Sequence, residues 1–292
     1  MVNVELPIKL DHVGLIMPRL EVGRTIYEQL GFTLTPQSNH SGSREPGSPV
    51  EQFGSGNHCV MLKKGYFEVM GLTDPDLYST AQTMLKKYQG LHIIAFEGAD
   101  AHTNYKILSQ RFDQVEEPRR LEREVNTGSH REAPSRAVFS NVTIDQDLFP
   151  EAKLIFIEHA TRDLLWRPEW MEHPNGAISL EEVALCVDDV DVVAAKFSRL
   201  FDLRPNFPMA DVALFKLSEG KVYIVNLAAL AKWAPGVVPP AVPSVFGVGF
   251  SVRDLNATKE LLNTNGVDYQ SHQYPGIWIR PEITGGAVVS FM

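Results

Sequence analysis

Two apolar segments of the chain each contain one histidine, and each is followed by a later apolar segment that contains one glutamate. His12 lies in LDHVGLI and Glu68 follows in YFEVM, while His92 lies in GLHIIAF and Glu158 follows in LIFIEH. A charge within an apolar strand is costly unless it is paired or bound to a metal. Two imidazoles and two carboxylates at one point suit a divalent cation. The repeated pattern therefore predicts one metal ion held by His12, Glu68, His92 and Glu158.

The last of these four positions has an alternative. His159 follows Glu158 directly, and adjacent residues of a strand point to opposite faces, so only one of the two can reach the site. The alignment of FIEHAT with YFEVMG favours Glu158, with His159 as its substitute. Taken alone, His12 would also suit a satisfied core histidine, and Glu68 would also suit an exposed strand carboxylate.

The elements that must position these residues repeat four times along the chain. Apolar spacing and the turn residues between segments predict four consecutive units of strand, helix and three further strands. The predicted first strands are residues 8–17, 91–97, 180–187 and 245–252, and the predicted helices are residues 20–30, 101–112, 191–200 and 255–265. The predicted last strands are residues 66–72, 153–159, 221–226 and 287–291, and a connecting helix is expected near residues 76–88.

A repeat of this length indicates duplication, so we expect an α+β fold in which pairs of units form curved mixed sheets. Two units make one sheet with a cleft, which predicts a first domain at residues 1–161 and a second at residues 179–292. Residues 162–178 form the predicted linker, and Trp166 and Trp170 within it indicate that it packs against the protein. Residues 36–56 are predicted to be a long loop, in which His40, Ser43 and Arg44 are candidates to meet a polar substrate.

Composition restricts the kind of protein. The chain has 292 residues, and a net charge of −9 argues against general nucleic-acid binding, which needs clustered Lys and Arg. The only cysteines, Cys59 and Cys186, are far apart and fit no metal or disulfide pattern. No signal peptide and no stretch near the roughly 20 apolar residues of a membrane span are visible, so we expect a cytoplasmic protein without a membrane partner. No GxGxxG, P-loop, GxSxG or HExxH motif is present.

The repeated unit and two longer segments carry a family resemblance. The opening LDHVGLIM, with YEQLGF, resembles the vicinal oxygen chelate superfamily, which includes glyoxalase I and the extradiol dioxygenases. NHCVMLKKGYFEVMG at residues 57–71 and LLWRPEWMEHPNGA at residues 164–177 resemble its glyoxalase-like domain branch. The resemblance covers nearly the whole chain and implies four βαβββ modules paired into two glyoxalase-like domains.

The resemblance also implies a ligand set. In bacterial glyoxalase I, a His on the first strand and a Glu on the last strand of each paired unit hold the metal, and these positions match His12, Glu68, His92 and Glu158. The same positions in the other two units are predicted to be Glu182, Ile224, Gly247 and about Ser290. This implies a metal-free second domain that forms a wall of the cleft or a homodimer contact, with Glu182 solvated or salt-bridged.

The leading functional hypothesis is a divalent-metal-dependent isomerase or lyase for a small metabolite that chelates the metal through two oxygens. The sequence does not choose among Ni, Zn, Mn, Co and Fe(II). The metal would stabilise an enediolate, and Glu158 or Glu68 would move a proton, as the resemblance to glyoxalase implies. One alternative is a ring-cleaving dioxygenase with Fe(II) held by His12, His92 and Glu158. Another is a non-catalytic binding or resistance protein.

Overall fold

Four modules of the same composition follow one another in the computed structural model, which describes residues 7–44, 48–125, 135–271 and 276–292. The first module contains β1 (Lys9–Met17), α1 (Leu20–Gln29), β2 (Ser38–Gly42), β3 (Glu51–Met61) and β4 (Tyr66–Leu72). The second contains β5 (Gly90–Glu97), α3 (Ala101–Arg111), β6 (Arg119–Val125), β7 (Ser135–Thr143) and β8 (Lys153–His159). The third contains β9 (Ala177–Cys186), α4 (Val190–Phe201), β10 (Asn206–Met209), β11 (Val212–Lys216) and β12 (Lys221–Val225). The fourth contains β13 (Ser244–Val252), α6 (Leu255–Thr264), β14 (Gln270–Ser271), β15 (Ile277–Ile279) and β16 (Val288–Phe291).

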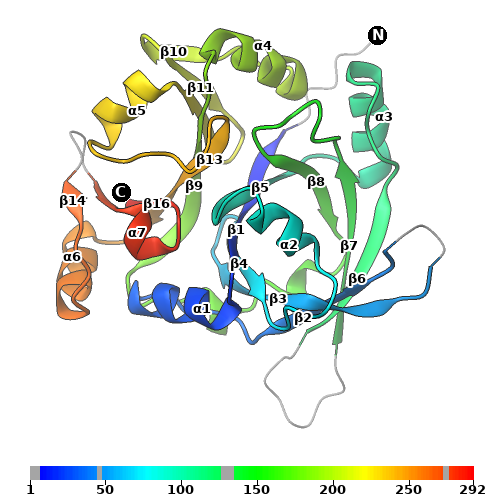
Figure 1. The fold of residues 1–292 in the computed structure, drawn as a ribbon, viewed down its shortest axis with the longest axis horizontal. Helices are drawn as coiled ribbons and strands as arrows, with labels where there is room; N and C mark the ends of the chain where they lie inside the picture. The colour runs from blue at the N-terminus through cyan, green and yellow to red at the C-terminus, as the bar shows by residue number, and fades with distance from the viewer. Residues whose placement is uncertain (1–6, 45–47, 126–134, 272–275) are drawn as a thin grey trace.

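The modules pair through their first strands, as Figure 1 shows at the centre of each half. Within each module the first and last strands are parallel neighbours: β1 with β4, β5 with β8, β9 with β12 and β13 with β16. Antiparallel pairing of β1 with β5 builds the first half of the molecule, and pairing of β9 with β13 builds the second. Strands β5 and β13 pair through Leu91 and Val245, which connects the halves into one mixed sheet, and isolated bridges such as Lys9 with Glu219 also join them. This confirms the predicted fold of four βαβββ modules in paired sheets.

One face of each half turns toward a hydrophobic core that both halves share. Helices α1, α3, α4 and α6 contribute to this core, which draws residues from all four modules. Aromatic rings cross the boundary: Phe32 lies 5.1 Å from Phe250 between ring centroids, and Phe96 lies 5.0 Å from Phe201. Burial of these rings on both sides makes the two halves depend on each other for their stability.

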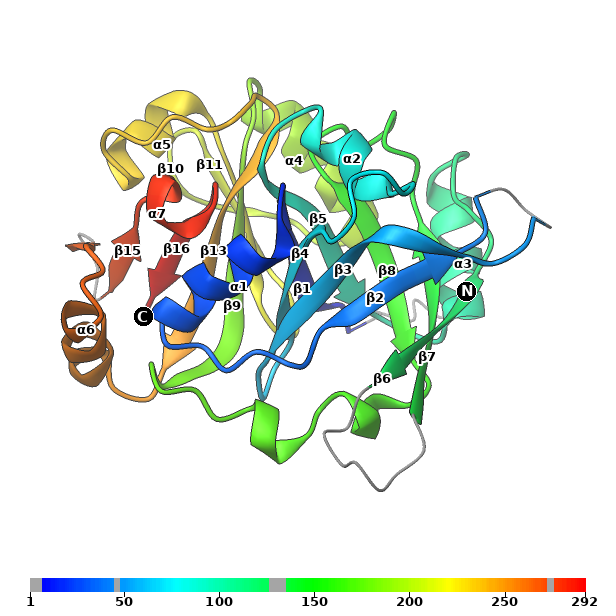
Figure 2. The same ribbon diagram turned by 60° about the horizontal axis from the view of Figure 1, so that its bottom comes forward.

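The opposite faces carry two short helices, one that follows the first module and one that follows the third. Helix α2 (Thr80–Leu85) packs on the first half through Ala81 and Met84, and α5 (Leu227–Trp233) packs on the second half through Ala229 and Leu230. Figures 1 and 2 show α2 against β1 and β4 and α5 beside β10 and β11. We call these surfaces the α2 face and the α5 face. A further short helix, α7 (Pro281–Thr284), precedes β16.

The segment between the halves is packed down, as its tryptophans predict. Trp170 is buried beside Cys59 and Met61, and the segment contains two 3₁₀ turns, Arg162–Leu164 and Pro168–Trp170. The His173 ring donates from Nε2 to the carbonyl of Met61 (2.9 Å) and accepts from the Thr33 N–H at Nδ1 (3.0 Å). The connection is therefore part of the folded structure of the first module.

Several local predictions differ from the structure. Residues 36–56 are not a long loop, because β2 and the first half of β3 pair there as an antiparallel hairpin. The side chains of β2 are polar or absent on both faces, so apolar spacing does not reveal this strand in the sequence. Within the described ranges no helix is long and apolar enough to cross a membrane.

The shared core makes a prediction about stability. Phe250 is fully buried, and its ring contacts Phe32 and Phe67 of the first half. We expect Phe250→Ala to lower the free energy of unfolding by about 3–5 kcal/mol and to leave one cooperative transition in urea, because the cavity weakens both halves. Phe207→Ala is the control, since Phe207 is 54% exposed and its loss should change stability by less than about 0.5 kcal/mol. Two separate transitions, or equal effects of the two substitutions, would show that the halves do not share a core.

Candidate functional site

Strand alternation decides which of the predicted residues reach the α2 face. On β4, Phe67 and Val69 belong to the shared core, so Glu68 points to the opposite face with Met70. On β1, Val13 belongs to the shared core and His12 points to the α2 face. The His12 ring there stacks on the ring of Tyr66 from β4 (centroids 4.3 Å apart). The first module thus brings the predicted His12 and Glu68 to one buried surface.

On β8 the alternation reverses the expected choice between the last two residues. Phe156 belongs to the shared core, and Glu158 lies on the same side, where its Oε2 accepts a hydrogen bond from the Ala101 N–H (2.8 Å) at the start of α3. Ile157 packs on the α2 face, and His159 follows it there. The register of FIEHAT on YFEVMG is therefore offset by one residue, and the substitute His159, rather than Glu158, shares a face with His12 and Glu68.

His92 also lies apart from the first-module pair. Its Nε2 donates to the carbonyl of Tyr88 (2.9 Å), and its ring stacks on the Tyr88 ring with centroids 4.0 Å apart. The pairing of β1 with β5 shifts by one residue beside His92, so a similar place in the apolar segment does not give His92 the orientation of His12. His12 lies eight residues before the start of α1, and the residue eight before the start of α3 is Ile93.

The equivalent of Glu68 in the second module is apolar as well. Glu68 pairs with Gly14, two residues after His12, and the corresponding pair in the second module is Ala95 with Ile155. Ile93, Ala95 and Ile155 all belong to the apolar cluster under α2. The second module therefore supplies isoleucines where the family resemblance implied a histidine and a glutamate.

The residues present do not fit the predicted metal sites. His92 and Glu158 are engaged elsewhere, so neither the two-His, two-Glu set nor the dioxygenase set of His12, His92 and Glu158 assembles. In the part of the chain that the structure describes, no group of three or more His, Cys, Asp or Glu side chains is arranged to hold a metal ion. Aliphatic carbons at residues 93 and 155 offer no lone pair to a cation.

A buried carboxylate between two histidines occupies the α2 face instead. Asp11 is 2% exposed, and its Oδ1 accepts hydrogen bonds from Nδ1 of His12 (2.7 Å) and Nε2 of His159 (3.3 Å). Burial raises the pKa of Asp11, but the hydrogen bonds and charges of the two histidines outweigh it and hold that pKa far below its usual value. The sequence analysis missed Asp11, although an aspartate inside the apolar run LDHVGLI is itself a signal.

Glu68 is ionised in a polar pocket of neighbours. Its Oε1 accepts a hydrogen bond from the side-chain amide of Asn57, and its Oε2 lies beside Gly14 of β1, where a Cβ would lie 3.4 Å from Oε2 and 3.0 Å from Cβ of Ile93. Burial raises the pKa of Glu68, but His12, His40 and Arg123 together lower it below its usual value. His40, which was predicted in a loop, thus reaches this site from β2, where its Nδ1 lies 3.0 Å from the Ser55 hydroxyl.

Two cations from the second module, Arg123 and Lys153, act electrostatically on the Glu68 carboxylate. Arg123 lies on β6, and its pKa is raised by Cys59, Tyr66 and Glu68 although burial opposes this. Lys153 lies on β8 on the side of Ile157, and burial lowers its pKa against the opposing influence of Glu116 and Glu68. Strand β6 exposes Arg119, Arg120 and Glu122 to solvent and contributes the partly buried Arg123 to the α2 face.

Some buried polar atoms of this face have no hydrogen-bond partner among the described residues. They are Oδ2 of Asp11, Nδ1 of His159 and Oδ1 of Asn141 on β7. Unpaired buried polar atoms are rare in native structures and mark places where a ligand or water binds. Buried charges together with unpaired polar atoms make the α2 face the candidate functional site.

Comparison with known proteins identifies the family. The sequence profile of the family described as "Glyoxalase-like domain" matches residues 10–201, so the chain belongs to this family, within the vicinal oxygen chelate superfamily. No curated protein sequence matches the chain.

Similar solved structures extend over almost the whole chain. A hypothetical protein from Staphylococcus aureus is 15% identical with a TM-score of 0.60 and covers 98% of this chain and 99% of its own. A mutant of 4-hydroxymandelate synthase from Streptomyces coelicolor is 10% identical with a TM-score of 0.55, covering 98% and 92%. Homoprotocatechuate 2,3-dioxygenase from Arthrobacter globiformis is 11% identical with a TM-score of 0.52, covering 99% and 81%. At these identities the likeness establishes the fold.

The buried Asp11 makes a prediction about acid stability. Its folded-state pKa lies below the unfolded value, so its contribution is complete above that value and is lost as the pH falls toward the lowered pKa. Below about pH 5, we expect the free energy of unfolding to decrease more in wild type than in Asp11→Asn. The total decrease should differ by at least about 1.4 kcal/mol. Urea titrations at a series of pH values measure this. The exposed Asp76→Asn should keep the wild-type slope, and an unchanged slope in Asp11→Asn would contradict the assignment.

A second prediction concerns the two residues that lie apart. We expect His92→Ala and Glu158→Gln to leave the metal content of the purified protein, whatever it is, equal to that of the wild type. Their side chains bind backbone groups of Tyr88 and Ala101 and do not face His12 or Glu68. Elemental analysis by inductively coupled plasma mass spectrometry measures the content, with circular dichroism to verify folding. Loss of metal in either folded variant would restore the predicted four-ligand set.

Proposed function

We propose that this protein is an enzyme that binds a small, oxygen-rich metabolite on the α2 face and moves a proton on a carbon beside a carbonyl group, as an isomerase or lyase. The observation that carries the proposal is the gathering of Asp11, His12 and Glu68 with Arg123 on one buried surface. Such groups are costly to bury and cluster where their protonation states are used. The superfamily assignment supports an enzyme, and the particular reaction rests on these side chains.

Glu68 is the proposed general base. Its lowered pKa keeps it ionised at neutral pH, so it can accept a proton without first losing one. The Asn57 amide donates a hydrogen bond to one of its oxygens, which fixes the orientation of the carboxylate, and Gly14 of β1 lies beside the other. A substrate C–H group directed at Oε2 would meet an oriented acceptor.

His12 is the proposed second proton carrier. Because ionised Asp11 accepts from Nδ1, the neutral imidazole ring is held with its proton on Nδ1 and its Nε2 is left to accept. An acid that orients a histidine in this way also stabilises the imidazolium ion formed when Nε2 takes a proton. Tyr66 stacks on the ring and limits its rotation. His12 can therefore accept a proton on Nε2 from a substrate hydroxyl group and deliver it to the neighbouring carbonyl oxygen, while Glu68 carries the proton that it removes from one carbon to the next.

Arg123 and Lys153 are the proposed binding groups for negative charge. Proton removal beside a carbonyl puts charge on oxygen, and fixed cations in a buried place stabilise that charge far more than they would in water. Both cations act on Glu68 electrostatically, so they lie close enough to serve a substrate held beside it. This arrangement supplies a base, an acid and charge stabilisation from side chains alone.

Ring cleavage is the less favoured reading, because its predicted Fe(II) ligands His12, His92 and Glu158 point in different directions. The same placement removes the predicted way of holding Ni, Zn, Mn, Co or Fe(II), so no step of the proposed reaction is assigned to a metal. A small-molecule substrate remains the expected partner, since the α2 face offers buried polar groups rather than an extended surface.

The test follows proton exchange on carbon. Glycolaldehyde, dihydroxyacetone and pyruvate are incubated in D₂O with the purified protein, and proton NMR measures the loss of C–H signal beside the carbonyl. We expect catalysed exchange with at least one compound and a decrease of about 10²- to 10⁴-fold in Glu68→Gln, because the base is removed. Glu21→Gln, on the exposed side of α1, is the control and should keep the wild-type rate. Equal rates in Glu68→Gln and wild type would exclude Glu68 as the base.

A further inference from the structure

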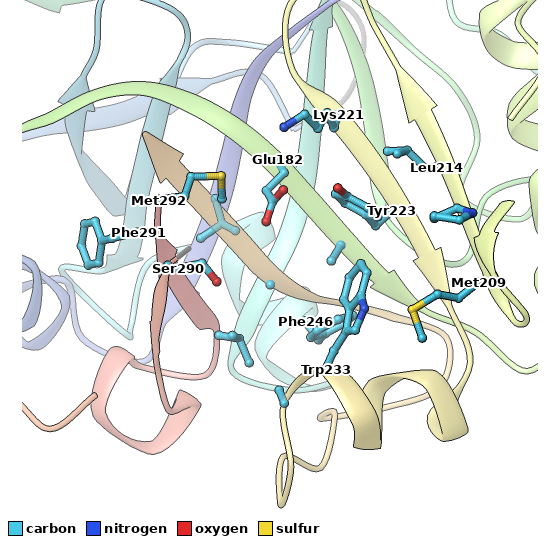
Figure 3. A pocket seen from close by; sticks show the side chains of 17 residues that line it. Glu182, Met209, Leu214, Lys221, Tyr223, Trp233, Phe246, Ser290, Phe291 and Met292 are labelled. Carbon is cyan, nitrogen blue, oxygen red and sulfur yellow. The ribbon is translucent and has the colours of Figure 1, made fainter. Parts of the chain in front are cut away.

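The second half contains a cavity that the proposed reaction does not use. It has a volume of about 340 Å³ and lies on the α5 face, between β9, β12, β13 and β16 and the helix α5. Its walls are mainly aromatic and sulfur-containing side chains, including Met209, Tyr223, Trp233, Phe246 and Met292. Figure 3 shows these side chains around the carboxylate of Glu182. The volume falls in the range of small-molecule sites.

The cavity occupies the position that corresponds to the Glu68 site of the first half. Glu182 lies eight residues before the start of α4, as His12 does before α1, and Gly247 lies eight before the start of α6. Tyr223 pairs with Ala184 as Glu68 pairs with Gly14, so Tyr223, rather than the predicted Ile224, takes the place of Glu68. Glu182, Tyr223 and Gly247 all line the cavity, together with Ser290. Duplication has therefore kept the location and changed the chemistry.

Glu182 is the only acidic side chain among the described residues that line the cavity, and it has no ion-pair or hydrogen-bond partner within the described ranges. It was expected to be solvated or salt-bridged. It is partly exposed and makes no salt bridge among the described residues. Its side chain lies against β13, because Gly249 has no Cβ, and a Cβ there would lie 2.5 Å from Cγ of Glu182. Burial raises its pKa to about 7, with Lys221 opposing and Glu181 adding to the shift.

A partly buried carboxylate that lines an apolar cavity, with no ion pair among the described residues, favours a positively charged ligand. We propose that the α5-face cavity binds a small organic ammonium ion with an apolar body, whose charged nitrogen pairs with Glu182. The bound cation would offset the cost of removing the carboxylate from water, which Lys221 on the neighbouring strand now offsets only in part. Ser290 faces the same region and offers a hydroxyl oxygen to a second N–H group (Figure 3).

The walls fit the rest of such a ligand. The ring faces of Trp233, Tyr223 and Phe246 are partially negative, so they attract ammonium groups, and the same rings pack against apolar carbon. Met209 adapts its shape to an irregular apolar body. Lys221 is the one cation of the lining, and Figure 3 shows it on the side of Glu182 that is remote from Trp233 and Phe246. An ammonium held near the rings therefore lies away from the lysine.

Two matched probes test the proposal: 4-ethylbenzylamine, which is a cation, and 4-ethylbenzyl alcohol, which is its neutral counterpart. Ligand-observed NMR titrations at about pH 8, above the pKa of Glu182, give both dissociation constants. We expect wild type to prefer the amine, and Glu182→Gln to bind the amine about 10- to 100-fold more weakly with little change for the alcohol, as a charge-assisted hydrogen bond is lost. Glu181→Gln is the matched control. It removes the same charge from the adjacent residue, whose side chain accepts a hydrogen bond from Ser179, and should keep the preference.

A second variant locates the binding independently of Glu182. Ala184→Leu fills part of the cavity with apolar atoms, so it should weaken both probes and leave the protein folded, as judged by circular dichroism. Three results would overturn the proposal. They are equal affinities of wild type for amine and alcohol, an undiminished amine preference in Glu182→Gln, and undiminished binding of both probes in Ala184→Leu. Each of them leaves the proton-transfer proposal for Glu68 unaffected, because the two faces are separate.

Discussion

Parallel pairing of the first and last strands of each module is the constraint on which both sites depend. This pairing places a residue of the first strand beside one from the last strand, with both side chains on the same face. His12 meets Tyr66, and Gly14 meets Glu68, through this register alone. A shift of one residue in β4 would send Glu68 into the shared core and Phe67 to the site. The chemistry of each module therefore depends on which alternate residues of its strands point away from the shared core.

The shared core explains why the two sites lie where they do. Since α1, α3, α4 and α6 all face the middle of the molecule, the remaining faces of both halves are free to hold polar groups. Each of these faces is closed at one end by the short helix that follows the module, α2 or α5. Under α2 the space is filled by Ala81 and Met84 against isoleucines of β5 and β8, whereas under α5 a cavity remains. The same scaffold therefore gives one crowded, charged face and one open, largely apolar face.

The sequence predicts the modules well because apolar spacing and helix starts repeat in each of them. It also predicts His12 and Glu68 on one face, since both lie between core residues of their strands. It fails for His92 because a shift in strand pairing lies beside that residue, and spacing in a sequence carries no sign of such a shift. It fails for Glu158 because two adjacent residues of FIEHAT, Glu158 and His159, are polar. Only the structure, in which Phe156 packs in the shared core, shows that Glu158 points to that side of the strand. Asp11 escaped notice since its role depends on His159, far away in the chain.

The carboxylates of the two faces have opposite pKa shifts, because the faces carry different numbers of neighbouring charges. On the α2 face, Asp11 and Glu68 lie among histidines and cations, which outweigh burial and keep both carboxylates ionised with lowered pKa values. On the α5 face, Glu182 has one lysine, Lys221, beside it on β12, and burial outweighs the effect of that lysine and raises the pKa of Glu182 to about 7. A carboxylate compensated by its neighbours is suited to act on a substrate, because its charge persists whether or not the substrate is bound. An uncompensated carboxylate gains most when a cation arrives, so the same residue type favours catalysis on one face and ligand binding on the other.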